Sequence, residues 1–219
     1  MSRVFSAVKL DFYSAKTNLR IGVIMFAVSI LLGVLTKRPV LIIIYNMMFA
    51  TFLSGMIFSV DDKNNLHKLY GILPLKKTEW VTARYLYAAA IGFINLALVA
   101  AAVLIISNML DTPFDSLTLF AFLGASLIYY CFSVGVIYPV YIRLSFSKAY
   151  IFTMLPIALI GVGVMLIARR TELSGSINGL MGFFSSNQSL ILIFALCVGI
   201  IFLGISVLAA CAMYRKKEL

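Results

Sequence analysis

Six apolar stretches divide the chain, and polar or charged segments separate each stretch from the next. A helix needs about 20 residues to cross about 30 Å of hydrocarbon, and every stretch reaches or approaches that length. We therefore predict six transmembrane helices. The predicted spans are 21–36, 40–60, 84–107, 117–142, 149–168 and 189–213.

The composition agrees with this pattern. Hydrophobic residues make up 63% of the 219 positions and charged residues 12%, whereas soluble domains are about 45–50% apolar and about 25% charged. A chain of this length cannot hide such an excess inside one globule, so the surrounding medium must itself be apolar. The sequence predicts an all-α integral membrane protein with a single transmembrane domain over residues 1–219.

The positive charges are distributed unevenly about the predicted spans. If the N-terminus is cytoplasmic, 14 of the 18 lysines and arginines fall on the cytoplasmic side. Cytoplasmic loops carry such an excess, so both termini are expected to be cytoplasmic. The net charge of +10 then reflects topology and attraction to anionic lipid, and it does not indicate nucleic-acid binding.

The predicted spans contain no Asp, Glu, Lys or His in their interiors. Such residues mark proton relays and metal sites inside membranes, so we expect no catalytic residue and no metal ligand. Cys131, Cys197 and Cys211 lie in apolar runs without metal-ligand spacing and are expected to be small core residues. No Gly-Lys dipeptide occurs, which excludes a P-loop, and no cofactor is expected on this chain.

An amphipathic pattern precedes the first span. Within residues 1–20, apolar side chains recur at helical spacing, and they are Phe5, Val8, Phe12, Ala15 and Leu19. This pattern predicts a helix that lies in the membrane interface, for which plain anchoring is the simplest role.

A polar insert over 61–83 separates the second and third spans. Asp61 or Asp62 can cap a short helix that Pro74 ends, and Thr78 can cap the next helix. One face of the short helix would then carry Leu66, Leu69, Tyr70 and Leu73. A helix of this kind can lie on lipid or fit a groove on a partner protein.

Two strings at the ends of the insert carry a family resemblance. "FSVDDKNN" closes the second span, and "LPLKKTEWVTARYL" leads into the third. Their pattern resembles ABC-2-type export permeases, in particular small bacterial permeases of the kind found in phenol-soluble modulin exporters. The matching residues are Phe58, Asp61, Asp62, Asn64, Leu73, Pro74, Lys76, Lys77, Val81, Arg84 and Tyr85.

The resemblance implies that the insert holds a coupling helix, which docks into a groove on a separate ATP-binding subunit. Its apolar contact would be the face defined above, ended by Pro74, and its polar rim would be Asp61, Asp62, Lys63, His67 and Lys68. Two permeases and two ATPases would assemble in the bacterial cell membrane, with ATP and Mg bound by the partner. Identical permeases are the default expectation, and a heterodimer is the alternative. Residues 169–188 would form a re-entrant or surface hairpin on the outer side, or an ordinary loop.

The resemblance thus predicts a permease subunit of an ATP-driven exporter. The expected cargo is amphipathic: a modulin-like toxin, an antimicrobial peptide or a lipid-like drug. Seventeen phenylalanines and ten methionines suit an adaptable apolar route. Phe49, Phe52 and Met56 are the predicted wall residues, although ordinary helix packing also explains them. The alternative function is a membrane-bound regulatory or immunity protein that binds a partner without transport.

Overall fold

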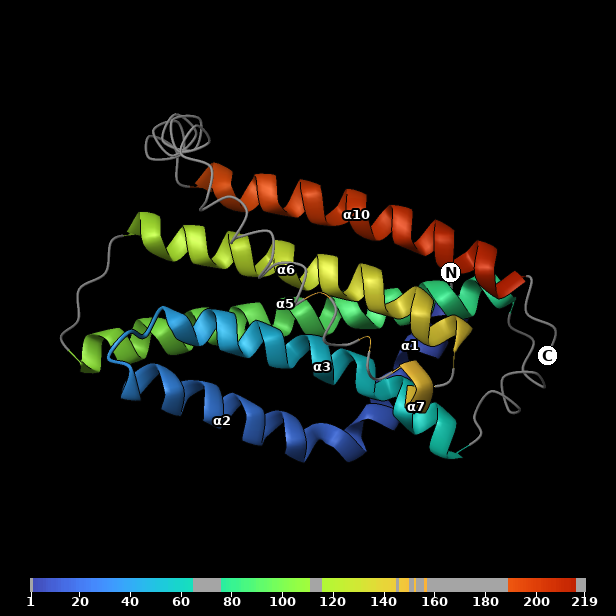
Figure 1. Cartoon of the computed structure of the whole chain (residues 1–219), viewed down its shortest axis with the longest axis horizontal. Helices are drawn as coiled ribbons and strands as arrows, with labels where there is room; N and C mark the ends of the chain where they lie inside the picture. Colours follow the sequence, from blue (N-terminus) through green and yellow to red (C-terminus); the bar gives the residue numbers. More distant parts are fainter. Residues whose placement is uncertain are drawn as a thin grey trace.

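A computed structural model describes residues 2–64, 76–110, 116–144, 146–149, 152, 156 and 189–215, and all regular structure in these ranges is helical. The five longest helices run side by side along the long axis of the molecule (Figure 1). In chain order, the helices are α1 (Ser2–Ala15), the short 3-10 helix η1 (Lys16–Asn18), α2 (Leu19–Leu35), α3 (Leu41–Asn64), α5 (Lys77–Met109), α6 (Ser116–Arg143), α7 (Phe146–Ala149) and α10 (Ser189–Arg215).

Four of these helices are long and apolar enough to cross a membrane, namely α3, α5, α6 and α10. They confirm the spans predicted at 40–60, 84–107, 117–142 and 189–213. Helix α2 covers the first predicted span with 17 residues and meets α1 at a bend of 72°. The described residues therefore hold four spanning helices, or five if the bent pair counts as one. The span predicted at 149–168 lies almost wholly outside the described residues, so the count of six stays a prediction.

The helices pack in an order that places α3 and α6 inside the bundle. Helix α10 packs along α6, α3 contacts both α5 and α6, and α2 lies on α3 at the opposite edge (Figure 1). Helices α2, α3, α5 and α6 alternate in direction along the chain, and α10 runs in the same direction as α6 (Figure 1). The end of α3, the start of α5 and the ends of α6 and α10 therefore meet at one end of the bundle, where α1 crosses behind α3 and α5. We call this the α1 end.

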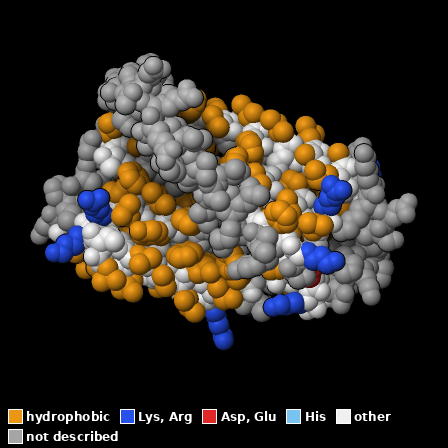
Figure 2. Space-filling model, viewed as in Figure 1, with side chains coloured by type: hydrophobic (Ala, Val, Ile, Leu, Met, Phe, Trp, Pro, Cys, Tyr) orange, Lys and Arg blue, Asp and Glu red, His pale blue; other side chains and the backbone are white. Residues whose placement is uncertain are grey.

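The outer surface is apolar. Hydrophobic side chains cover most of the described surface in Figure 2, with few lysines and arginines among them. Large side chains stand far out of the bundle, including Leu208 at 72% exposure and Ile200 at 65%. Soluble monomers rarely expose apolar patches of this extent, so the surface fits a multi-pass membrane protein surrounded by lipid.

Helices α5 and α6 approach each other closely at Gly92. A Cβ atom at Gly92 would lie 2.4 Å from Cε1 of Tyr130. The Tyr130 hydroxyl also donates a hydrogen bond of 2.7 Å to the carbonyl of Ala88, one turn earlier on α5. The absence of a side chain at Gly92 thus lets the ring lie against the α5 backbone.

The two ends of the polar insert differ from the prediction. Helix α3 continues to Asn64, so Asp61 and Asp62 lie in its last turns and do not cap a new helix. Helix α5 begins at Lys77, and its N-cap is Lys76, not Thr78. The physical reason lies in Glu79: its carboxylate accepts the Lys76 N–H at 2.9 Å and places a negative charge at the helix N-terminus.

The middle of the insert lies outside the described residues, and so does the predicted hairpin over 169–188. The predicted coupling helix is therefore not placed. The predicted contact residues outside the described part are Leu66, His67, Lys68, Leu69, Tyr70, Leu73 and Pro74.

Candidate functional site

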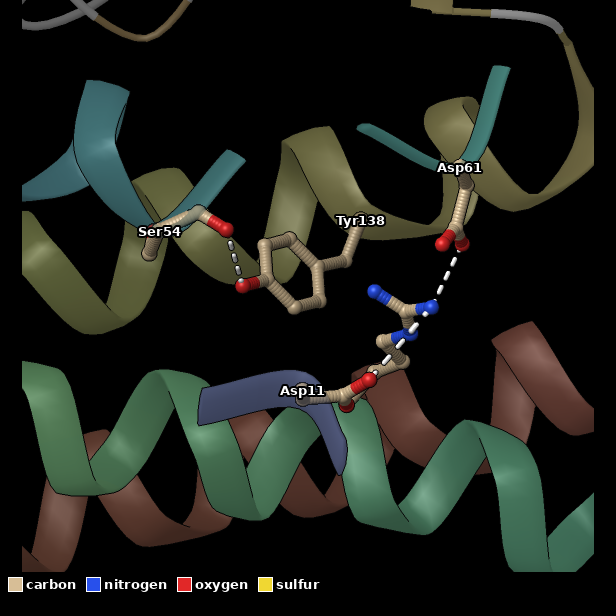
Figure 3. A network of polar contacts seen from close by, with 5 residues as sticks. Asp11, Ser54, Asp61 and Tyr138 are labelled. Carbon is tan, nitrogen blue, oxygen red and sulfur yellow. Dashed lines mark hydrogen bonds and ion pairs between the residues drawn. The ribbon is translucent and has the colours of Figure 1, made fainter. Parts of the chain in front are cut away.

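A fully buried arginine joins three helices at the α1 end. Arg84 of α5 has 0% exposure. Its Nη2 atom lies 2.5 Å from Oδ2 of Asp61 on α3 and 3.5 Å from Oδ1 of Asp11 on α1. Figure 3 shows the two carboxylates approaching from opposite sides. A buried charge persists only when it is paired, so these two acids explain how an arginine is accommodated here.

Aromatic rings surround the guanidinium on its other sides. The Arg84 Cζ atom lies 4.9 Å from the ring centroid of Trp80 and 5.3 Å from that of Phe58. Trp80 precedes Arg84 by one turn of α5, so the two side chains share one helix face. Trp80 also stacks on Tyr214 near the end of α10, with centroids 5.0 Å apart. The stacked Trp80 ring therefore extends the cluster to a fourth helix, α10.

The cluster carries two acids for one base. Asp11 is buried, and this burial raises its pKa from the ordinary 3.8 to about 7. The Arg84 guanidinium lowers the pKa of Asp11, and the Asp61 carboxylate raises it further. The cluster can therefore gain or lose one proton near neutral pH, at the α1 side of Arg84.

The cluster fixes both ends of the polar insert. Asp61 is the first residue of the insert and Arg84 directly follows its last residue, 23 positions later in the sequence. The next residue, Asp62, accepts the backbone N–H of Phe146 at the start of α7, with a donor–acceptor distance of 2.5 Å. The end of α3 is thus tied to α5, to α1 and to the segment after α6.

The three described residues of the predicted polar rim separate into two groups. Asp62 and Lys63 are exposed at the end of α3. Asp61 has only 7% exposure, because its carboxylate turns inward to Arg84. This corrects the expected position of Asp61, since the sequence placed it with its neighbours on a surface rim.

The predicted wall residues Phe49, Phe52 and Met56 lie on α3 and are half-buried. Met56 precedes Phe58 of the arginine cluster by two residues on α3, and Phe49 and Phe52 lie further from the cluster along the helix. Their role as walls of a route stays a prediction.

Sequence reasoning did not identify the partnership of Asp11 with Arg84. A signal was present, because Asp11 is the only acidic residue in the first 60 positions. In the structure, α1 buries Ala7 and Asp11 against the bundle, whereas the predicted apolar face includes Phe5 at 66% exposure. The amphipathic pattern indicated a helix but not the face that packs.

Buried hydroxyls join the long helices next to the cluster. The Tyr138 hydroxyl on α6 donates to the Ser54 carbonyl on α3 at 2.9 Å (Figure 3). The hydroxyls of Tyr85 and Ser206 lie 2.6 Å apart and join α5 to α10, and Ser206 also donates to the Gly135 carbonyl on α6. These bonds satisfy polar groups that the bilayer could not.

No group of three or more His, Cys, Asp or Glu side chains with metal-binding geometry occurs in the described part of the chain. The arginine cluster has the geometry of a structural joint between helices: its polar atoms face one another and its rim is aromatic. The site is therefore suited to transmit movement between segments.

Comparison with known proteins gives one match. Residues 8–215 match the family described as ABC-2 family transporter protein, and this range holds the four helices of the described residues that are each long and apolar enough to cross a membrane. No curated protein and no solved structure matches the chain. The narrower resemblance to permeases of phenol-soluble modulin exporters has no support from these comparisons and stays a prediction.

Proposed function

We propose, since the chain belongs to the ABC-2 family of transporter proteins, that it is the permease of an exporter of amphipathic substrates. Family membership makes it the membrane subunit of an ABC transporter and implies a partner that binds ATP. The proposal adds three elements: the direction of transport, the class of cargo, and the route by which ATP-driven movement enters the membrane helices.

One observation carries the proposal, namely the joint that Arg84 makes between the two ends of the insert. A partner that pulls on residues 65–75 acts on the end of α3 and the start of α5, which Asp61 and Arg84 hold together. Removing one partner of a buried ion pair costs about 3–5 kcal/mol, while exposed pairs contribute about 0–1 kcal/mol. The buried ion pair between Asp61 and Arg84 would therefore stay intact under a pull that breaks an exposed ion pair.

The proposed docking surface begins at the exposed residues Asp62 and Lys63. It continues through the apolar and polar residues predicted for the coupling helix, from Leu66 to Pro74. Asp61 is assigned a different role: its buried ion pair with Arg84 holds the docking segment to α5. In this proposal the exposed residues contact the partner, and the buried residues transmit the movement of the partner to the membrane helices.

The proposed assembly contains two copies of this permease and two ATPases. ATP and Mg bind to the partner subunits, and this chain contributes no catalytic residue. The bacterial cell membrane and cytoplasmic termini complete the proposal. The arrangement of the helices supports it, because α1 and the end of α10 lie at the same end of the bundle as the end of α3 and the start of α5, which flank the insert (Figure 1).

The proposed cargo is an amphipathic peptide, such as a modulin-like toxin or an antimicrobial peptide, or a lipid-like drug. Half-buried Phe49, Phe52 and Met56 on the central helix α3 support an apolar wall that adapts to such cargo. Stimulation of ATP hydrolysis by an amphipathic helical peptide, but not by a sequence-scrambled peptide without an apolar face, is the expected sign of this cargo.

The decisive experiment is copurification with the ATP-binding subunit. Leu69→Asp/Leu73→Asp should insert into the membrane normally and lose the ATPase, because charges would enter the apolar contact. Leu110→Asp is the matched control, since Leu110 is exposed at the end of α5 far from the insert. Retention of the ATPase by the double variant, with unchanged turnover, would place the insert on lipid and overturn the proposed coupling.

A further inference from the structure

A long groove lies between α1, α2, α3 and α5 at the α1 end. Its volume is about 1080 Å³. Helices α2 and α5 form its two walls, and α3 forms its floor through Leu53 and Ile57. Helix α1 lines one end with Phe5, Val8 and Phe12.

The walls of the groove are apolar and open to the side of the bundle. Val23 on α2 is 61% exposed, and Ile94 and Leu98 on α5 are 50% and 53% exposed. The lining runs along α5 from Tyr87 to Leu98, which is about 16 Å at 1.5 Å per residue. That length is close to half of the about 30 Å of hydrocarbon in a bilayer, so the groove spans about one leaflet.

The charged residues of the groove are two lysines at its α1 end. Lys9 and Lys16 both line it and are exposed. Among the described residues, neither lysine forms an ion pair, since Asp11 on the same helix turns away to Arg84. The Lys9 Nζ atom lies 6.0 Å from the ring centroid of Tyr13, which also lines the groove. The groove thus has a cationic end and an apolar body one leaflet long.

We infer that this groove binds one anionic phospholipid, with the phosphate between Lys9 and Lys16 and an acyl chain along α2 and α5. Ammonium groups bind phosphate as point charges, and lysines near a membrane surface attract anionic lipids. An apolar peptide would leave the two lysines unpaired, and a second permease copy would have to supply acidic residues opposite them. The inference rests on the groove and its lysines and does not depend on the proposed export function.

Photo-crosslinking in nanodiscs of equal phosphatidylglycerol and phosphatidylcholine tests this inference. The photo-reactive residue p-benzoylphenylalanine replaces Ile94 in the groove or, as a control, Ile105 on the same helix. Ile105 is 60% exposed and does not line the groove. The complex with the ATP-binding subunit is used, and the lipid adducts are identified by mass spectrometry. We expect phosphatidylglycerol adducts to be enriched about thirtyfold at position 94, as two lysines near the surface predict, and to follow the bulk ratio at position 105.

Charge variants identify the cause of the enrichment. Lys9→Gln/Lys16→Gln should bring the ratio at position 94 down to that of the bulk, and Lys9→Arg/Lys16→Arg should preserve the enrichment. Lys37→Gln/Arg38→Gln removes the same charge from the far end of α2 and should leave the ratio unchanged. Bulk lipid proportions at position 94 of the otherwise unchanged chain would overturn the inference. Crosslinks from position 94 to a second permease copy would overturn it in favour of a protein interface.

Discussion

Asp61 and Arg84 are 23 positions apart in the sequence and form a buried ion pair. The intervening segment is the polar insert, so the pair closes its two ends. Asp11 joins the same guanidinium from α1. In the sequence, Asp61 and Arg84 each look like an ordinary charge at the boundary of a span. In the structure they form one ion pair that joins the end of α3 to the start of α5.

Replacing Arg84 should destabilise the protein more than any replacement of an exposed charge. Arg84→Gln leaves two buried carboxylates without their partner, and the expected loss is about 3–5 kcal/mol. Thermal unfolding in detergent measures the effect. The control Arg143→Gln, at an exposed position in the last turn of α6, should change stability by less than about 0.5 kcal/mol.

Adding Asp11→Asn and Asp61→Asn to Arg84→Gln should recover much of the lost stability, because no uncompensated charge then remains buried. A triple variant as unstable as Arg84→Gln alone would mean that packing of the arginine side chain, and not its charge, holds the joint.

The stability of the protein should fall as pH rises through the weakly acidic range. The pKa of Asp11 is raised to about 7 in the folded protein, from an ordinary value of 3.8. Between these values the folded state holds a proton that the unfolded state has released, so each increase in pH favours unfolding. Above about 7 both states have lost the proton, and this contribution no longer changes.

Thermal unfolding measured across this pH range checks the sign. Asp11→Asn should remove the decline, since the amide does not titrate. An equal decline in this variant would show that another group causes it. A rise of stability with pH in the unchanged chain would show instead that Arg84 dominates over burial at Asp11.

Gly92→Ala should destabilise the contact between α5 and α6. The added Cβ would lie 2.4 Å from the Tyr130 ring, and a forced shift of a packed core side chain typically costs about 1–3 kcal/mol. Gly204→Ala on α10 is the matched control, because a Cβ there meets nothing within 4 Å. That control should be neutral or stabilising by up to about 1 kcal/mol through helix propensity. Equal melting temperatures for the two variants would contradict the close approach at Gly92.

Trp80→Leu should weaken the arginine cluster, because it removes the ring that covers the guanidinium and stacks on Tyr214. A desolvated cation–π contact contributes up to about 2 kcal/mol, so a loss of about 1–2 kcal/mol is expected. Trp80→Phe retains a ring and should lose less. The melting temperatures of the two variants test whether the ring stabilises the guanidinium. A leucine variant as stable as the phenylalanine variant would exclude a cation–π contribution.

The family and the helical membrane architecture were predictable from the sequence. A hydrophobic segment long enough to span the bilayer forms a helix in lipid, because a helix makes all of its backbone hydrogen bonds within the segment. The spans at 40–60 and 117–142 were therefore found to within a few residues in α3 and α6. The string from Phe58 to Tyr85 also pointed to the family that the whole-chain comparison supports.

The sequence by itself determined which segments are helical and apolar, because local periodicity and hydropathy depend only on neighbouring residues. The tertiary structure decided which charges meet. Asp61 was expected on a surface rim and is buried, Asp11 was given no role and pairs with Arg84, and α3 extends to Asn64 beyond its predicted end. The pairing depends on where α1 crosses the bundle and on the rotation of three helices about their axes, and a periodic pattern leaves both undetermined.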